Sequence, residues 1–208
     1  MLENYKTIYA GGEGEITEKK SRFIATVRLV EKEEDALAFI EEMKKKYWDA
    51  RHNCYAYSIG EHREFTRCSD DGEPSGTAGR PMLDVILGEN IYNVAVVVTR
   101  YFGGILLGTG GLVHAYSKGA SMALANAEIV NMEVADSLKI SCDYTMYGIA
   151  NSVLSEFESI IRDTEFTDSV CIYADVKTEL TESLTAKLID RCNGKVKIEK
   201  LKSGYVEF

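Results

Sequence analysis

Short runs of hydrophobic and polar positions predict four strands in the first part of the chain. Residues 7–15, 23–30 and 54–59 carry the alternation expected of strands. Residues 94–99 form a continuous apolar run, which is typical of a strand buried on both faces. This part of the chain is therefore expected to build a sheet.

Helical spacing separates these strands. Residues 33–47 place apolar side chains three and four positions apart, with acidic residues first and lysines last, which favours a helix through its dipole. Residues 112–127 show a second stripe, entered from a glycine-rich loop. A third helix is expected to run toward Leu87, with Ser75 or Thr77 as its N-cap. Strands mixed with helices indicate an α+β fold.

The period changes again near residue 135, where a second set of elements begins. They follow in the order strand 138–142, helix 146–157, strands 160–166 and 170–176, helix 180–188 with Thr178 as cap, and a strand after Gly194. This βαββαβ order is ferredoxin-like. We therefore expect two domains, residues 1–131 and 132–208.

Composition narrows the class of protein. The chain has 208 residues, 45% of them hydrophobic, and carries a net charge of −9. No apolar run approaches the roughly 20 residues of a membrane span, and residues 1–6 contain no apolar signal region, so a cytoplasmic location is expected. The negative charge argues against binding nucleic acid or anionic lipid by bulk charge. The five cysteines form no Cys-x-x-Cys pair and are expected to be free thiols.

Glycine is concentrated in the middle of the chain. Eleven of the 17 glycines lie between Gly60 and Gly119. Such a cluster marks turns or a cradle for a ligand.

One chemically suggestive segment covers residues 68–81. Asp70, Asp71 and Glu73 lie there beside two hydroxyl groups and Arg80. The carboxylates could bind Mg²⁺ or act as acid and base. They could equally belong to a turn that leads into a capped helix. Both interpretations remain open from the sequence.

A second segment, residues 99–112, runs from a strand through five glycines into a helix. Unpaired N–H groups at such a helix start could hold a phosphate, with Arg100 as counter-charge and His114 nearby. Arg100 beside two exposed aromatic residues would also suit stacking on a base or a peptide. The alternative is that the glycines allow the loop to pack closely on the sheet.

Histidine and cysteine give weaker indications. His52 with Cys54, and His62 with Cys68, do not have the spacing of familiar zinc sites. A peptide hydrolase that uses Cys54 or Cys68 as nucleophile is retained as a minor hypothesis. No metal site and no cofactor are expected.

Three strings, in this order, resemble the IMPACT family and within it the bacterial, two-domain YigZ/YvyE-like branch. They are Arg-His-Asn-Cys-Tyr-Ala-Tyr from residue 51, Ser-Asp-Asp-Gly-Glu-Pro from residue 69 with Gly-Thr-Ala-Gly from residue 76, and Arg-Tyr-Phe-Gly-Gly from residue 100 with the glycines up to 111. The resemblance covers the whole chain.

The resemblance implies that the first domain is similar to the second domain of ribosomal protein S-five. The second domain would be similar to domain five of elongation factor G. Eukaryotic members of the family regulate translation during amino-acid starvation, but they carry an additional RWD domain for which this chain has no room. Their partner is therefore not transferred to this chain.

Together, these observations favour a non-enzymatic regulatory or binding protein linked to translation and stress response, which contacts RNA, the ribosome or a translation factor. The alternative is a Mg²⁺-dependent enzyme that acts on a phosphorylated metabolite or nucleotide. No catalytic residue is assigned and no oligomeric state is predicted. The candidate binding residues are His52, Asp70, Asp71, Glu73, Ser75, Thr77, Arg80, Arg100, Tyr101, Gly103, Gly104, Gly108, Gly110, Gly111 and His114.

Overall fold

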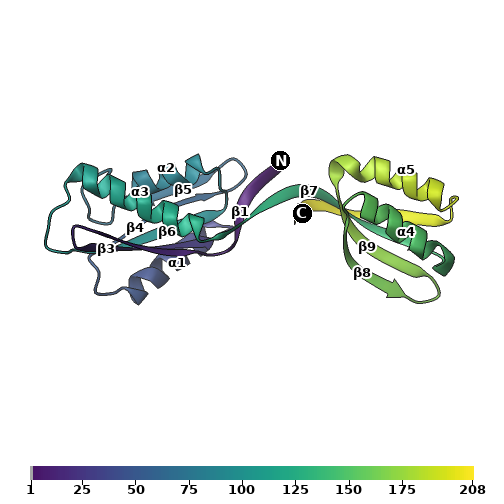
Figure 1. Cartoon of the computed structure of the whole chain (residues 1–208), viewed down its shortest axis with the longest axis horizontal. Coiled ribbons are helices and arrows are strands. Elements are labelled where there is room, and N and C mark those ends of the chain that lie inside the picture. Colours follow the sequence, from purple (N-terminus) through teal and green to yellow (C-terminus); the bar gives the residue numbers. More distant parts are fainter. Residues whose placement is uncertain (1) are drawn as a thin grey trace. The chain divides into compact units, whose positions relative to one another are not determined.

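The computed structural model describes residues 2–208, which divide into two compact units. The first unit is Tyr5–Asn131, and the second is Met132–Phe208 together with Leu2–Asn4. Each unit contains helices and a sheet, which confirms the α+β class (Figure 1). Within residues 2–208 no helix is both long enough and apolar enough to cross a membrane.

The first unit is built on a sheet of order β2-β3-β6-β4-β5 whose neighbouring strands are antiparallel. The strands of this part of the chain are β1 (Asn4–Ala10), β2 (Glu13–Glu18), β3 (Ser21–Leu29), β4 (His52–Ile59), β5 (Phe65–Ser69) and β6 (Val94–Tyr101). The helices are α1 (Glu33–Lys46), α2 (Gly79–Gly88) and α3 (Thr109–Ala125). Strands β3 and β4 flank β6, so the connection through α1 crosses over one strand.

Helices cover both faces of this sheet. On one face α2 and α3 enclose the larger core, in which Met82, Ile86 and Tyr116 are fully buried. On the other face α1 packs Phe39 and its neighbours against the sheet. Strand β6 contributes side chains to both cores and is buried on both sides, as its apolar sequence predicts.

One prediction for this unit is wrong, and one strand was not predicted. Residues 7–15 do not form one strand, because the chain breaks between β1 and β2 at Gly11–Gly12. A Cβ at Gly12 would lie 2.2 Å from the carbonyl oxygen of Ala123, so only glycine allows this approach to α3. Strand β5 was not predicted, because its short and largely exposed sequence has no apolar alternation.

The second unit confirms the predicted βαββαβ order. Its elements are β7 (Glu128–Cys142), α4 (Tyr144–Glu156), β8 (Ile160–Phe166), β9 (Val170–Lys177), the short 3₁₀ helix η1 (Thr178–Leu180), α5 (Thr181–Arg191) and β10 (Val196–Glu207). The antiparallel strands lie in the order β10-β7-β9-β8. Helices α4 and α5 pack on one face, over Leu138, Ile140 and Ile172. The other face exposes the alternate side chains of each strand.

A buried carboxylate on β7 binds residues of three other elements of the second unit, η1, α5 and β10. Asp136, on β7, accepts hydrogen bonds from the hydroxyls of Thr178, Thr181 and Ser203, and from Lys200 at 2.8 Å. Burial opposes ionisation of Asp136, but these donors outweigh it and lower its pKa. Thr178 therefore uses its hydroxyl on Asp136 and does not provide the helix cap predicted from the sequence.

Candidate binding surface

The loop of residues 70–78, here called the acidic loop, folds around the side chain of Asp70. Its carboxylate accepts hydrogen bonds from the backbone N–H groups of Gly76 at 2.8 Å, Ala78 at 2.9 Å and Gly79 at 2.8 Å. Ala78 is the N-cap residue of α2 and Gly79 its first residue, so Asp70 caps that helix from a distant position in the loop. Burial disfavours the charged form, but the three N–H donors win and lower the pKa of Asp70.

The predicted cap of α2 is therefore wrong. The hydroxyl of Thr77 donates to the carbonyl of Pro74 at 2.6 Å, and Ser75 is exposed. Neither provides the oxygen that satisfies the first N–H groups of the helix. That oxygen comes from Asp70, which lies at the far end of the same loop.

Asp71 fixes the acidic loop to the start of β4. Its carboxylate accepts the N–H of Asn53 at 2.7 Å, and its carbonyl lies 2.8 Å from Nδ1 of His52. A carbonyl can only accept, so Nδ1 of His52 carries the proton in this contact. Both candidate residues therefore serve the attachment of the loop.

Glu73 lies at the centre of a buried polar cluster. Its Oε1 is 2.7 Å from Nη1 of Arg100 and accepts the hydroxyl of Tyr116 at 2.8 Å. The side chains of Arg100 and Glu73 are only 7% and 4% exposed. Burial, with Cys54 and Glu73 nearby, raises the pKa of Tyr116 and keeps its hydroxyl as a donor.

The expectation that Arg100 faces solvent as a contact for a ligand is wrong. The guanidinium lies between the rings of Phe23 and Phe102, whose centroids are 5.4 Å and 5.5 Å away, and Nη2 donates to Ser21 at 3.3 Å. Its charge is already compensated by Glu73. Arg100 therefore supports the surface from beneath.

Residues 102–108, here called the glycine loop, connect β6 to α3. A Cβ at Gly103 would lie 2.0 Å from the backbone of Lys20, so the loop can rest on the β2–β3 turn only with glycine at this position. The N–H of Gly103 donates to Ser21 at 3.2 Å. Gly104 and Gly108 have positive φ, while Gly110 and Gly111 lie in the first turn of α3. The interpretation that glycine allows the loop to pack closely on the sheet is thus confirmed at Gly103.

The start of α3 retains part of the predicted anion cradle. Gly108, Thr109 and Gly110 are exposed, and His114 is exposed one turn further on. The predicted counter-charge is missing, because Arg100 is paired with Glu73. The helix start alone is a weak anion site.

Glu73 joins the acidic loop to the two elements that flank the glycine loop, β6 and α3. This residue belongs to the acidic loop, and it contacts Arg100 near the end of β6 and Tyr116 about two turns into α3. Two other candidates make separate contacts. The hydroxyl of Tyr101 donates to Asp49 at 2.7 Å, and Arg80 pairs with Asp84 at 2.8 Å on the exposed side of α2.

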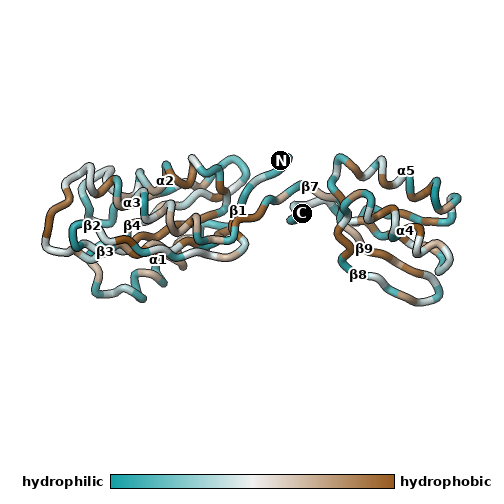
Figure 2. Tube along the Cα trace, viewed as in Figure 1, coloured by the Kyte–Doolittle hydropathy of each residue, from teal (hydrophilic) through white to brown (hydrophobic). Residues whose placement is uncertain are grey.

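Apolar side chains form the exposed part of the glycine loop. Phe102 is 49% exposed, Ile105 42% and Leu106 82%, and Val113 on the first turns of α3 is 38% exposed. The loop is coloured as hydrophobic in Figure 2. The sequence interpretation missed this feature, although Ile105-Leu106-Leu107 in a loop flanked by glycines was a visible signal.

The carboxylates of the acidic loop are not arranged for a metal ion. Within residues 2–208 no group of three or more His, Cys, Asp or Glu side chains could hold one. Asp70 and Asp71 bind backbone N–H groups, and Glu73 binds a cation and a hydroxyl. These three carboxylates therefore hold the acidic loop against the neighbouring elements.

The cysteines are free, and the two candidate nucleophiles are held as thiols. Cys54 is buried and its Sγ donates to the carbonyl of Asp70 at 2.9 Å. Burial, together with the nearby charges of Glu73 and Asp71, raises the pKa of Cys54. Burial and the charge of Asp70 also raise the pKa of Cys68. Neither environment favours a thiolate.

Two buried polar residues of this region were not anticipated. Tyr116 was predicted only as an apolar helix position, and its hydroxyl completes the contacts of Glu73. Asn53 joins β4 to β6 through a 2.7 Å hydrogen bond from Thr99. Their partners lie 43 and 46 residues away, so no local pattern identifies them.

The fold and this surface define a two-domain α+β protein whose first domain carries the acidic and glycine loops. The Impact N-terminal domain matches residues 19–124, and a domain of unknown function, DUF1949, matches residues 140–195. The chain belongs to the IMPACT family.

Similar proteins extend over nearly the whole chain. It is 39% identical over 207 residues to IMPACT family member YvyE of Bacillus subtilis, covering 100% of this chain and 95% of that protein. It is 34% identical over 182 residues to YigZ of Escherichia coli, covering 86% and 89%. A crystal structure of a hypothetical protein shares 31% identity and a TM-score of 0.63, and covers 97% of this chain and 99% of that one. The mouse protein IMPACT is 40% identical over 105 residues, which are 48% of this chain and 32% of that protein.

Proposed function

We propose that this chain is a non-enzymatic binding protein of the translation apparatus, and that it docks a protein of the ribosome or a translation factor through the glycine loop. The observation that carries the proposal is the exposed apolar row Phe102, Ile105 and Leu106 on a loop whose base is fixed. Exposed apolar side chains that gather in one place mark sites of protein interaction.

The loop is anchored before any partner binds. Gly103 rests on the β2–β3 turn, and Ser21 accepts hydrogen bonds from both Gly103 and Arg100. Next to it, the Arg100–Glu73 pair joins the end of β6, where the glycine loop begins, to the acidic loop. A surface that is ordered in advance loses less conformational entropy on association.

The surface favours protein over RNA as the partner. RNA binding rests on Lys and Arg side chains that reach phosphates, and Arg100, the one arginine of residues 99–112, is buried. The chain as a whole carries −9. The link to translation comes from the family resemblance. It implies that the two domains of the chain are similar to parts of a ribosomal protein and of an elongation factor.

The alternative function, a Mg²⁺-dependent enzyme, receives less support. It needs carboxylates with free oxygens, whereas Asp70 and Asp71 accept backbone N–H groups and Glu73 is paired with Arg100. No observation on this surface favours it over binding.

Cosedimentation of the full chain with bacterial ribosomes tests the proposal, with ribosomal RNA as a second arm, pull-down of purified translation factors as a third, and two salt concentrations in each. We expect binding to ribosomes or to a translation factor, with weak dependence on salt because the contact is apolar. Leu106→Ser should weaken it by about tenfold, as expected for removal of a buried leucine from an interface.

The matched control is Leu37→Ser, which changes a leucine that is 49% exposed on α1. It should leave binding unchanged. Equal loss in both variants, or no binding to any of these components, would sink the proposal. Strongly salt-dependent binding to the RNA alone would replace the protein partner with RNA.

A further inference from the structure

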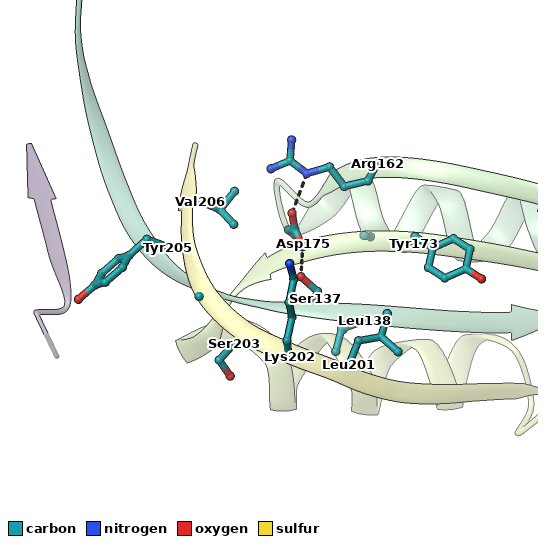
Figure 3. Close-up of a pocket in the computed structure, with 12 residues that line it drawn as sticks. Ser137, Leu138, Arg162, Tyr173, Asp175, Leu201, Lys202, Ser203, Tyr205 and Val206 are labelled. Carbon is teal, nitrogen blue, oxygen red and sulfur yellow. Dashed lines mark hydrogen bonds and ion pairs between the residues drawn. The ribbon is translucent and has the colours of Figure 1, made fainter. Parts of the chain in front are cut away.

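The sheet of the second unit carries a hollow of about 560 Å³ on the face opposite α4 and α5 (Figure 3). All four strands of the ferredoxin-like sheet line it. Its size falls within the range of about 300–1,000 Å³ that small-molecule sites occupy. The residues that matter for its chemistry are Ser137, Arg162, Tyr173, Asp175, Leu201 and Lys202.

Two β-bulges flank the hollow, one on each outer strand. The register of β8 shifts between Ile161 and Asp163, which makes Arg162 the extra residue. The register of β10 shifts between Lys200 and Lys202, which makes Leu201 the extra residue. Bulges redirect side chains and often adjoin functional sites. Here they bring a cation from each side of the sheet to one place.

A buried carboxylate orients the arginine. Asp175 is 5% exposed, and it accepts Nε of Arg162 at 2.7 Å and the hydroxyl of Ser137 at 2.5 Å (Figure 3). Asp175 binds only Nε of Arg162, so neither Nη group has a partner within residues 2–208. The side chain of Arg162 is 53% exposed. Planar Arg presents such N–H groups in the geometry that phosphate oxygens accept.

Lys202 supplies the second cation. It forms no ion pair or hydrogen bond with any other residue from 2 to 208, and its side chain extends toward Ser137 and Asp175 in Figure 3. The unit itself has more acidic than basic residues. Two cations with free donors and one already engaged carboxylate therefore make this hollow locally attractive to an anion.

An aromatic wall lies next to these donors. Tyr173 precedes Asp175 by two residues on the same face of β9, which places their Cα atoms about 6.6 Å apart. Its hydroxyl donates to Glu165 at 3.2 Å, which holds the ring, and Lys139 lies 5.5 Å from the ring centroid. Leu201 adds apolar surface on the β10 side.

We propose that this hollow is a nucleotide site. The phosphate binds Arg162 and Lys202, the hydroxyl of Ser137 lies within the same wall, and the base lies against Tyr173 and Leu201. Asp175 acts as a positioning residue for Arg162. The shared chemistry is a phosphate attached to a planar base, whether free or at the end of an RNA strand. This site is separate from the glycine loop, so either proposal can fail alone.

Calorimetric titration of the full chain with AMP, adenosine, inorganic phosphate and a short single-stranded RNA tests the site. We expect saturable binding of AMP that is about tenfold weaker in Lys202→Ala, because one charged contact is lost. Arg162→Lys should also weaken binding, since it keeps the charge but loses the fork. The control Arg191→Ala removes an exposed cation at the end of α5 and should change nothing.

Amide chemical shifts locate the binding independently of affinity. Perturbations at Ser137, Tyr173 and Asp175 support the site. If the RNA binds and is weakened by the same substitutions while AMP does not bind, the phosphate and base that the hollow recognises belong to an RNA strand. Binding of adenosine as tight as that of AMP overturns the role of the phosphate. The site itself is overturned by no binding of any probe at millimolar concentration, by shifts confined to other residues, or by equal weakening in Arg191→Ala.

Discussion

Arg100 shows that the role of a single side chain can depend on a partner far along the chain. Its neighbours in sequence, two aromatic residues and two glycines, indicate an exposed recognition residue. Its real partner, Glu73, lies 27 residues earlier and is buried with it. The residue types of this surface could be found from the sequence, but their burial could not, because burial follows from the packing of the loops over β6.

The buried pair gives a prediction about stability. Arg100→Leu should lower the free energy of unfolding by about 3–5 kcal/mol, because it leaves the carboxylate of Glu73 buried and unpaired. The double variant Arg100→Leu/Glu73→Leu should lose less than either single variant, since no lone charge remains. Urea unfolding of the three variants measures this. Losses that simply add would contradict it.

At the scale of elements, periodicity predicted the long and regular segments and failed at the contacts between elements. Helix α1, strand β6 and the helices of the second unit lie where the pattern placed them. The cap of α2 was assigned to Ser75 or Thr77 because capping is usually local. The acidic loop instead returns Asp70 to the helix start, and this depends on the turn at Asp71 and Gly72, both with positive φ.

Asp136 gives a pH-dependent prediction for the contact of β7 with α5 and β10. The folded-state pKa of this carboxyl is lowered below its ordinary value of 3.8. Its contribution to stability is therefore complete above about pH 4 and is lost as pH falls through the lowered pKa. Asp136→Asn should cost about 2 kcal/mol at pH 7, as expected for hydrogen bonds to a charged group.

The cost of Asp136→Asn should shrink as pH falls below 4, because the carboxyl of the unfolded chain then becomes protonated, and the native carboxyl follows at a lower pH. Urea unfolding from pH 7 to pH 3 follows the difference between the two proteins. Asp168→Asn, in the exposed turn between β8 and β9, is the control and should cost little at any pH. A cost for Asp136→Asn that stays constant over this range would argue against the charge as the cause.

At the scale of the whole molecule, the chain contains separate hydrophobic cores. The two cores of the first unit and the core of the second share no residue. The change of pattern near residue 135 indicated two domains, whereas the place of Leu2–Asn4 in the second unit could not be predicted. Pairing between distant segments leaves no local trace in the sequence.

Separate cores predict local rather than global loss of stability. Leu154→Ala should create a cavity in the core of the second unit and cost about 2–5 kcal/mol there. Hydrogen exchange followed by mass spectrometry should then show faster exchange in α4, α5 and β9. Peptides from β3, β4 and α2 should exchange as in the unchanged protein. Equal acceleration in both units would mean that the cores unfold as one.

The two bulges of the second sheet have a consequence for assembly as well as for the hollow. Among residues 2–208, strands β8 and β10 each pair with a single neighbouring strand, and the outer side of such a strand can recruit a strand of another chain. The extra residues Arg162 and Leu201 interrupt the regular ladder, and charged side chains flank both interruptions. The two bulges that direct Arg162 and Lys202 toward the hollow thus also make the outer strands too irregular for regular pairing with a strand of another chain. This protects a sheet with one open face from aggregation.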